Sequence, residues 1–175
     1  MGNVRLKGFT IVELLIVVVV IAILAAITIV SYNGIQNSAR QSKMNSDIAT
    51  IMKAVQAARS AESKTLAQIT GSTATGSNCW SRADGTDLAA LPASDLCWSR
   101  YQQALTLLGA ASGANLGSLV DPWGRPYLID ENEGEGGGCG RDTISVYKRP
   151  FTTAFGVLSG YATQNVPLSG YTGCS

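Results

Sequence analysis

An uninterrupted apolar run lies near the start of the chain. Leu14 to Val30 contains 17 residues without a charge and with a single hydroxyl, that of Thr28. The whole stretch 9–30 has 22 residues, and as a helix it would be about 33 Å long, which is enough to cross a bilayer. A cleaved secretory signal is the alternative, with Ala25 and Ala26 as its small-residue site. The length of the run favours a retained membrane-spanning helix.

A second pattern follows directly. Residues 31–61 contain no proline and one glycine, Gly34, and apolar residues recur there at steps of three or four. This spacing predicts an amphipathic helix that continues the apolar one, giving about 50 residues and about 75 Å in all. Its apolar face needs one partner surface. The residues predicted on that face are Ile35, Ala39, Ile48, Ile51, Met52, Val55 and Ala58.

The second half of the chain predicts that partner surface. We expect a polar, turn-prone linker at 71–76 and a short amphipathic helix at 99–110. Two prolines and a glycine in 121–127 predict a corner in which Trp123 and Tyr127 pack. Short strands are expected at 128–129, 144–147 and 153–158. The predicted fold class is α+β, with the long N-terminal helix packed on a small antiparallel sheet.

Composition and charge exclude several kinds of function. The chain is 46% hydrophobic and has 13 Lys and Arg against 12 Asp and Glu, a net charge of +1. Because no basic run is present, no nucleic-acid site is indicated. The absence of histidine from the sequence excludes imidazole-based catalysis and His-ligated metal sites. The sequence also has neither a nucleophile elbow nor a phosphate-binding glycine loop with lysine, so it indicates no enzyme.

One acidic side chain, Glu13, interrupts the start of the apolar stretch. A carboxylate near the membrane midplane costs roughly 2.5–3.5 kcal/mol and much less near an interface, so an intramembrane acid indicates a functional site. Glu13 therefore either lies shallow enough to reach the lipid headgroups or has a cationic partner. Arg5 and Lys7 precede the run without any acid, which favours an N-terminus held on the cytoplasmic side.

Four cysteines, Cys79, Cys97, Cys139 and Cys174, lie beyond the predicted helix. An even number after a membrane-type segment predicts two disulfides in an exported domain; reduced thiols in a cytosolic protein are the alternative. Three pairings are possible, and short, non-crossing loops favour Cys79 with Cys97 and Cys139 with Cys174. The sequence Cys-Trp-Ser-Arg occurs at both Cys79 and Cys97, an identity too short to establish a duplication.

The residues around Glu13 read Lys7-Gly8-Phe9-Thr10-Ile11-Val12-Glu13-Leu14-Leu15-Ile16-Val17. This segment closely resembles the N-terminus of type IV pilins and pseudopilins. The resemblance implies that a prepilin peptidase cuts between Gly8 and Phe9 and methylates the new amine of Phe9. It also implies that Glu13 pairs with the N-terminal amine of a neighbouring subunit, because charges buried between apolar helices are tolerable when they meet. Loss of the leader leaves 11 of the 13 basic side chains against 12 acidic ones.

The chain departs from this family at one position. Family members frequently have a proline near the end of the apolar segment, where this sequence has Val30. Whether the helix loosens there during assembly therefore stays open, and Gly34 is the only local helix breaker.

The corner 121–127 reads Asp-Pro-Trp-Gly-Arg-Pro-Tyr and resembles a motif of major pseudopilins and related Gram-positive-type pilins. Major pseudopilins bind calcium in a loop after this corner, and an acidic, glycine-rich loop follows it here. Carboxylate oxygens suit calcium, although the spacing is not that of an EF-hand and such loops are often only solvated. The candidate calcium ligands are Asp130, Glu131, Glu133, Glu135 and Asp142.

These observations together predict a structural subunit of a type IV pilus, a surface filament for adhesion, motility or DNA uptake. The alternatives are a major pseudopilin of a type II secretion or competence pseudopilus and, with less support, a single-span anchored binding module. The expected partners are further copies of the chain, prepilin peptidase, the assembly ATPase with its inner-membrane platform, and the membrane before assembly. No cofactor is expected apart from calcium.

The expected divisions follow from the same patterns. They are a leader at 1–8, a membrane and filament-core helix at 9–30, its amphipathic continuation at 31–61 and a disulfide-bearing head at 62–175. We expect a single-pass membrane protein with its head outside the cytoplasm, which becomes part of an extracellular filament.

Overall fold

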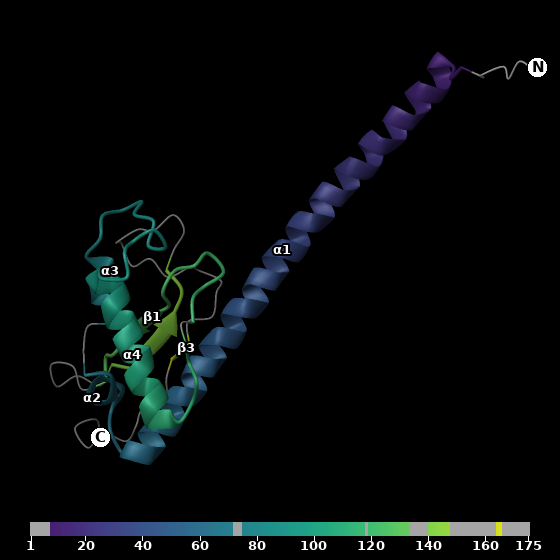
Figure 1. Ribbon diagram of the computed structural model, residues 1–175. Helices are drawn as coiled ribbons and strands as arrows, with labels where there is room; N and C mark the ends of the chain where they lie inside the picture. The colour runs from purple at the N-terminus through teal and green to yellow at the C-terminus, as the bar shows by residue number, and fades with distance from the viewer. Residues whose placement is uncertain (1–7, 72–74, 118, 134–139, 148–163, 166–175) are drawn as a thin grey trace, which may run out of the picture. The chain divides into compact units, whose positions relative to one another are not determined.

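The computed structural model describes the backbone of residues 8–71, 75–117, 119–133, 140–147 and 164–165. One long helix comes first, and short helices and short strands follow it along the chain (Figure 1), so the predicted α+β class is confirmed. The chain divides into two compact units, Met1–Arg40 and Gln41–Ser175. The elements are α1 (Ile11–Glu62), α2 (Leu66–Thr70), α3 (Ser77–Trp80), α4 (Leu96–Ser112), β1 (Leu128–Asp130), β2 (Thr143–Ser145) and β3 (Gln164–Asn165).

In the first unit, α1 is an exposed helix. Its large apolar side chains up to Ile29 are all exposed, and Phe9 ahead of it is 83% exposed. The helix continues through Gly34, where an added Cβ would meet nothing within 4 Å. The predicted continuation of the apolar helix into the amphipathic one is therefore confirmed.

In the second unit, the C-terminal part of α1 supplies one wall of a hydrophobic core. The predicted apolar face is buried from Met44 onward, whereas Ile35 is 68% exposed and Ala39 is also exposed. The prediction was wrong for these two residues, because the core residues contributed by α1 begin only at Met44. The buried residues of this face are Met44, Ile48, Ile51, Met52, Ala54, Val55 and Ala58.

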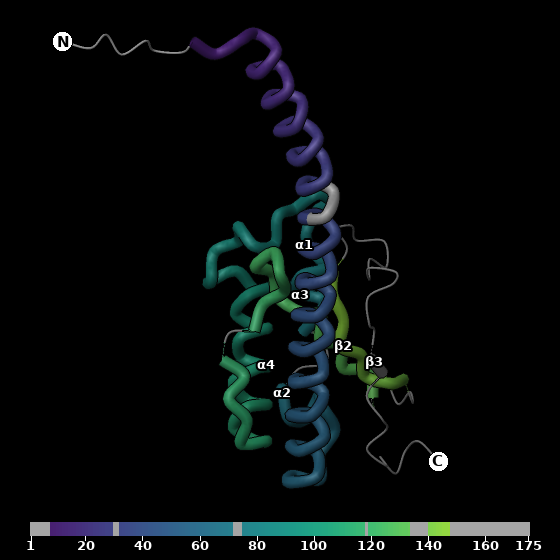
Figure 2. Tube along the Cα trace, turned by 90° about the vertical axis from the view of Figure 1, so that its right-hand side faces the viewer, coloured from purple at the N-terminus to yellow at the C-terminus, as the bar shows by residue number. Residues whose placement is uncertain are grey.

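The helix α4 lies alongside the C-terminal part of α1 (Figure 2), and its buried side chains form a second wall of the same core. Trp98, Tyr101 and Leu105 lie on its buried face. The predicted helix is confirmed but is longer at both ends. It starts earlier because the Asp95 carboxylate accepts a hydrogen bond from the Cys97 N–H, and it ends at the left-handed Gly113, whose φ is 72°.

The sheet is antiparallel, in the order β1-β2-β3. Ile129 of β1 pairs with Ile144 of β2, and both face the core that α1 and α4 share. Leu128, one residue earlier, belongs to a second cluster that surrounds Cys79, Cys97 and Tyr147. The strand expected at 153–158 lies outside the described residues, and β3 was not predicted from the sequence.

The segment expected to be a polar linker is only partly one. Gly71 ends α2 in a left-handed conformation, but Thr75 is 2% exposed and Gly76 is buried. A Cβ at Gly76 would collide with the side chain of Leu128 and with the carbonyl oxygen of Ile129. The prediction was wrong for this end of 71–76, because the backbone there packs directly against β1.

Candidate processing and assembly site

The helix α1 begins with a capping box formed by Thr10 and Glu13. The Thr10 N–H and hydroxyl donate to Glu13 Oε2 at 2.9 and 2.8 Å, and the Glu13 N–H donates to Thr10 Oγ1 at 3.2 Å. Each residue thus satisfies a backbone N–H that the first turn of a helix leaves without an intrahelical partner. This capping box was not predicted, although Thr-x-x-Glu ahead of an apolar run is its sequence signature.

The capping box and the helix end both act on the charge of the Glu13 carboxylate. Its carboxylate lies in the first turn of α1, where the helix dipole favours a negative charge. Two donors from Thr10 replace part of the hydration that the carboxylate would lose in lipid. The single chain therefore holds the carboxylate in place before any partner binds. Among the described residues, both hydrogen bonds that the Glu13 side chain accepts come from Thr10 and reach Oε2, and none reaches Oε1.

Gly8 and Phe9, the predicted processing residues, precede the helix. Both are exposed and neither is part of a regular element, since α1 begins at Ile11. The peptide bond between them is thus outside the hydrogen-bonded helix, in the extended or irregular kind of backbone that a peptidase can bind. Glu13 lies four residues after Phe9, in the first turn of α1.

The part of α1 that follows is long and apolar enough to cross a membrane by length and composition. Residues 5–29 match a family model described as the prokaryotic N-terminal methylation motif. This motif is the class III signal of type IV pilins and pseudopilins, and it covers the expected cleavage site, Glu13 and most of the apolar stretch.

The class III signal supports a type IV pilin-like or pseudopilin precursor and indicates a structural subunit. It also implies processing by prepilin peptidase and the use of pilus assembly machinery in general. Together with the apolar helix it fits a membrane-anchored precursor. No curated protein and no solved structure matches the chain.

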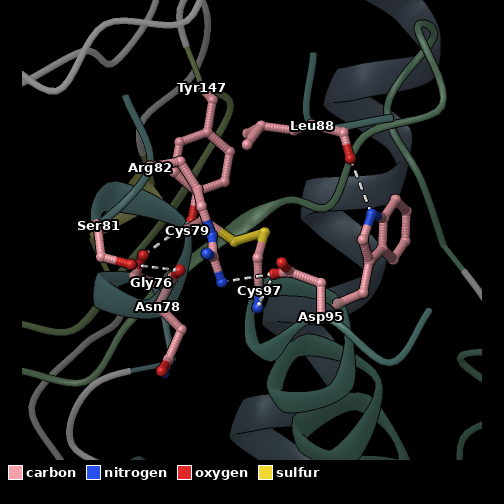
Figure 3. Close-up of a disulfide and its surroundings, with 10 residues drawn as sticks. Gly76, Asn78, Cys79, Ser81, Arg82, Leu88, Asp95, Cys97 and Tyr147 are labelled. Carbon is pink, nitrogen blue, oxygen red and sulfur yellow. Dashed lines mark hydrogen bonds and ion pairs between the residues drawn. A yellow bond between two sulfur atoms is a disulfide. The ribbon is translucent and has the colours of Figure 1, made fainter. Parts of the chain in front are cut away.

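Away from the class III signal, a disulfide joins Cys79 to Cys97, the pairing that short loops favoured. It ties the end of α3 to the first turn of α4, and both cysteines are buried (Figure 3). Arg82 pairs with Asp95 at 2.7 Å beside it, and Tyr147 packs against the same cluster. The Cys139–Cys174 pairing lies outside the described residues and stays a prediction.

The two Cys-Trp-Ser-Arg copies meet at this disulfide but have different surroundings. Trp98 is buried and its indole N–H donates to the Leu88 carbonyl at 2.8 Å, whereas Trp80 is half-buried. Arg82 makes the ion pair with Asp95, whereas Arg100 donates to the side chain of Gln103. The copies thus share the disulfide and little else.

The corner 121–127 is held by a buried ion pair. Asp121 accepts hydrogen bonds from the backbone N–H groups of Trp123 and Arg125, each at 2.9 Å, and pairs with the Arg125 side chain at 2.7 Å. Tyr127 is buried as predicted and donates to Asp47 of α1 at 2.7 Å. Burial, and then the hydrogen bond to Asp47, raise the pKa of Tyr127 above its ordinary value, so this phenol stays a donor.

The candidate calcium ligands form ion pairs and hydrogen bonds with different partners. Glu133 and Asp142 both pair with Arg59 of α1. Glu131 accepts hydrogen bonds from the Thr70 hydroxyl and from the Thr75 N–H and hydroxyl. Asp130 is half-buried on β1, and Glu135 lies outside the described residues. Within the described ranges, no three acidic or cysteine side chains are grouped to hold a metal ion, so the four described candidates do not fit a calcium site by themselves.

Glu131 is fully buried, with no exposed surface. Among the residues that the structure describes, no cation pairs with it. Burial raises the pKa of Glu131 to about 7, although the hydrogen bonds from Thr75 and Thr70 act in the opposite direction. Glu131 thus changes its charge near neutral pH.

Proposed function

We propose that this chain is the precursor of a type IV pilus subunit that is cut between Gly8 and Phe9, methylated on Phe9 and polymerised through α1. The observation that carries the proposal is the class III signal at residues 5–29, which includes an apolar helical stretch whose large side chains are exposed. In the precursor these side chains contact lipid, and in a filament they contact the α1 helices of neighbouring subunits instead.

The capping box supports a specific role for Glu13 in that process. Cleavage creates a charged amine at Phe9, and the Glu13 carboxylate of a neighbouring subunit is its counter-charge. Thr10 holds only Oε2 of Glu13, so Oε1 is available to a new donor. Pairing the two charges between apolar helices avoids the large cost of burying either one alone.

The topology of the proposal follows from charge and redox chemistry. Arg5 and Lys7 keep the leader on the cytoplasmic side, so the stretch 9–30 spans the membrane and the head, 62–175, lies outside. The Cys79–Cys97 disulfide supports an oxidising compartment for the head. The amphipathic part 31–61 connects the two, and the assembly ATPase acts from the cytoplasm through an inner-membrane platform.

A major pseudopilin of a secretion or competence pseudopilus is the second candidate. The corner 121–127, with its Asp121–Arg125 ion pair, is the observation that favours it. Electron microscopy of cells and of sheared surface material separates the two. Long surface filaments that contain this chain support a pilus, and their absence from cells that process the chain supports a pseudopilus.

The processing step is tested by identifying the N-terminal residue of the chain isolated from cells. We expect a methylated Phe9 by mass spectrometry. Gly8→Val should leave the chain uncut, because a branched side chain would stand at the cleavage site. The substitution should not disturb the fold, since a Cβ added at Gly8 would meet nothing within 4 Å. Gly34→Ala, at another glycine with open space around it, is the control and should be cut normally.

The opposite result has a clear meaning. Wild-type chains that retain Met1 in cells would contradict the pilus and pseudopilus proposals together and would favour an anchored binding module.

A further inference from the structure

Arg59 lies at the C-terminal end of α1 between two carboxylates, Glu133 and Asp142, that come from the two ends of the β1–β2 connection. Its Nη2 is 2.7 Å from Glu133 Oε2 and also contacts Asp142 Oδ2. The side chains of Arg59, Glu133 and Asp142 are 8%, 1% and 0% exposed. Two negative charges and one positive charge are thus buried together, in the last turn of the helix, where the dipole also favours a cation.

The two acids are also joined to each other through the backbone. The Glu133 N–H donates to Asp142 Oδ1 at 2.7 Å, so each oxygen of Asp142 has a donor. Next to them, the Asn132 side chain donates to the Arg141 carbonyl at 3.3 Å. Residues 132–133 and 141–142 are the two ends of the connection between β1 and β2, so Arg59 holds these ends together and to α1.

This arrangement opposes a bound divalent cation. A calcium ion at Glu133 and Asp142 would lie next to the guanidinium, and like charges in a buried site repel strongly. Calcium also takes six to eight oxygen ligands, whereas the neighbouring Glu131 is engaged with Thr70 and Thr75. The position that a metal ion would take is already occupied by a cation of the protein itself.

We propose that Arg59 is the built-in counter-ion of the β1–β2 connection, so that the head folds and stays attached to α1 without calcium or any other bound cation. The planar guanidinium is suited to this task because it contacts two carboxylates at once and does not lose its charge. This inference does not depend on whether the chain forms a pilus or a pseudopilus.

The first test uses the full-length wild-type chain, purified in detergent. Its thermal midpoint should be the same in excess EGTA and in millimolar calcium chloride, and calorimetric titration with calcium chloride should show no stoichiometric binding. A midpoint that rises with calcium, or saturable binding of one calcium ion per chain, would overturn the proposal.

The second test removes the counter-ion. Arg59→Met leaves two buried carboxylates without their cation, so the thermal midpoint should fall by roughly 10 °C or more. Lys53→Met is the matched control, since Lys53 is an exposed cation on the same helix, and it should shift the midpoint by less than about 2 °C. An Arg59→Met chain as stable as the control would overturn the proposal.

A third variant keeps the question decidable if Arg59→Met fails to fold. Combining Arg59→Met with Glu133→Gln and Asp142→Asn removes all three charges while keeping similar shapes, and this chain should fold and regain most of the lost stability. If the triple variant is no more stable than Arg59→Met, the loss comes from packing and the counter-ion role is wrong.

Discussion

The two halves of α1 belong to one helix but meet opposite surroundings. Up to Ile29 the helix is apolar on all sides and its large side chains are exposed, whereas from Met44 it buries one face in the core that it shares with α4 and the sheet. The difference teaches which partner each half needs. The second half finds its partner within the chain, and the first half needs lipid or other copies of the chain.

The first half of α1 and the head each contain one carboxylate that accepts hydrogen bonds from threonines. In the first half Thr10 donates twice to Glu13, and in the head Thr70 and Thr75 donate three hydrogen bonds to Glu131. Glu131 has no exposed surface, whereas Glu13 lies on an exposed helix end. We therefore expect changes at Glu13 to affect assembly and changes at Glu131 to affect the stability of the head.

The largest expected effect is the loss of filaments from Glu13→Leu and Glu13→Ala. Neither variant can provide the counter-charge for the Phe9 amine, so the precursor should accumulate in the membrane in normal amounts while filaments disappear. The measurement is immunoblotting of membrane and sheared surface fractions. Val12→Leu, an apolar exchange in the same helical turn, is the control, and normal filaments from both Glu13 variants would refute the charge-pair role.

The contrast between the two halves predicts unequal effects of the same substitution. Ile51→Ala should destabilise the head by about 2–5 kcal/mol, because it removes buried atoms and leaves a cavity. Ile23→Ala removes the same atoms from an exposed position and should change the unfolding of the head by less than about 0.5 kcal/mol. Denaturant unfolding of the full chain in detergent, followed by tryptophan fluorescence, measures both.

Equal losses in the two variants would break the comparison. They would mean that the first half of α1 is packed against protein in the single chain, contrary to its exposure in the structure.

The smallest of these effects is a pH dependence centred on Glu131. Its pKa is about 7 in the folded chain against an ordinary value of 4.5, so the folded state binds the proton more tightly. The contribution of Glu131 to stability is therefore fully present below about pH 4.5, falls as the pH rises to about 7, and is constant above that. The total change is about 3 kcal/mol.

Glu131→Gln removes this titration while keeping a side chain that can bond to both threonines. The variant should exceed the wild type in stability above about pH 7, and the gap should shrink toward about pH 5. Thermal unfolding at several pH values tests this, with Glu62→Gln, at the end of α1, as the control for a less buried acid. A gap that does not depend on pH would show that the carboxyl stays ionised throughout.

Sequence reasoning was most successful where the cause of the structure is local. The apolar run, the amphipathic continuation and α4 follow from spacing within a few turns, and the corner 121–127 follows from its prolines and glycine. The short helices α2 and α3 were not predicted, since α2 has five residues and depends on the Thr65–Gln68 capping box inside a segment without strong periodicity. The exposure of Ile35 was missed because periodicity does not show where a partner surface begins.

The acidic residues around the β1–β2 connection show what a sequence pattern leaves out. Five carboxylates near glycines resemble a cation site, but the pattern contains nothing about Arg59, which is 74 residues from Glu133 along the chain. The hydrogen bond from Thr75 to Glu131 could likewise not be predicted, because the composition of 71–76 indicates a polar linker. Only contacts between distant segments decide which charges meet.

The sequence by itself therefore determined the class III signal, the membrane-length helix and the position of Glu13 in its first turn, because these depend on residue order over one helix and on the length of a bilayer. The tertiary structure alone decided that the face of α1 from Met44 is buried, that Arg59 pairs with both Glu133 and Asp142, and that Glu131 is buried without a cation among the described residues. The physical reason is that the free energy of a buried charge depends on which groups surround it, and that is set by folding across the whole chain.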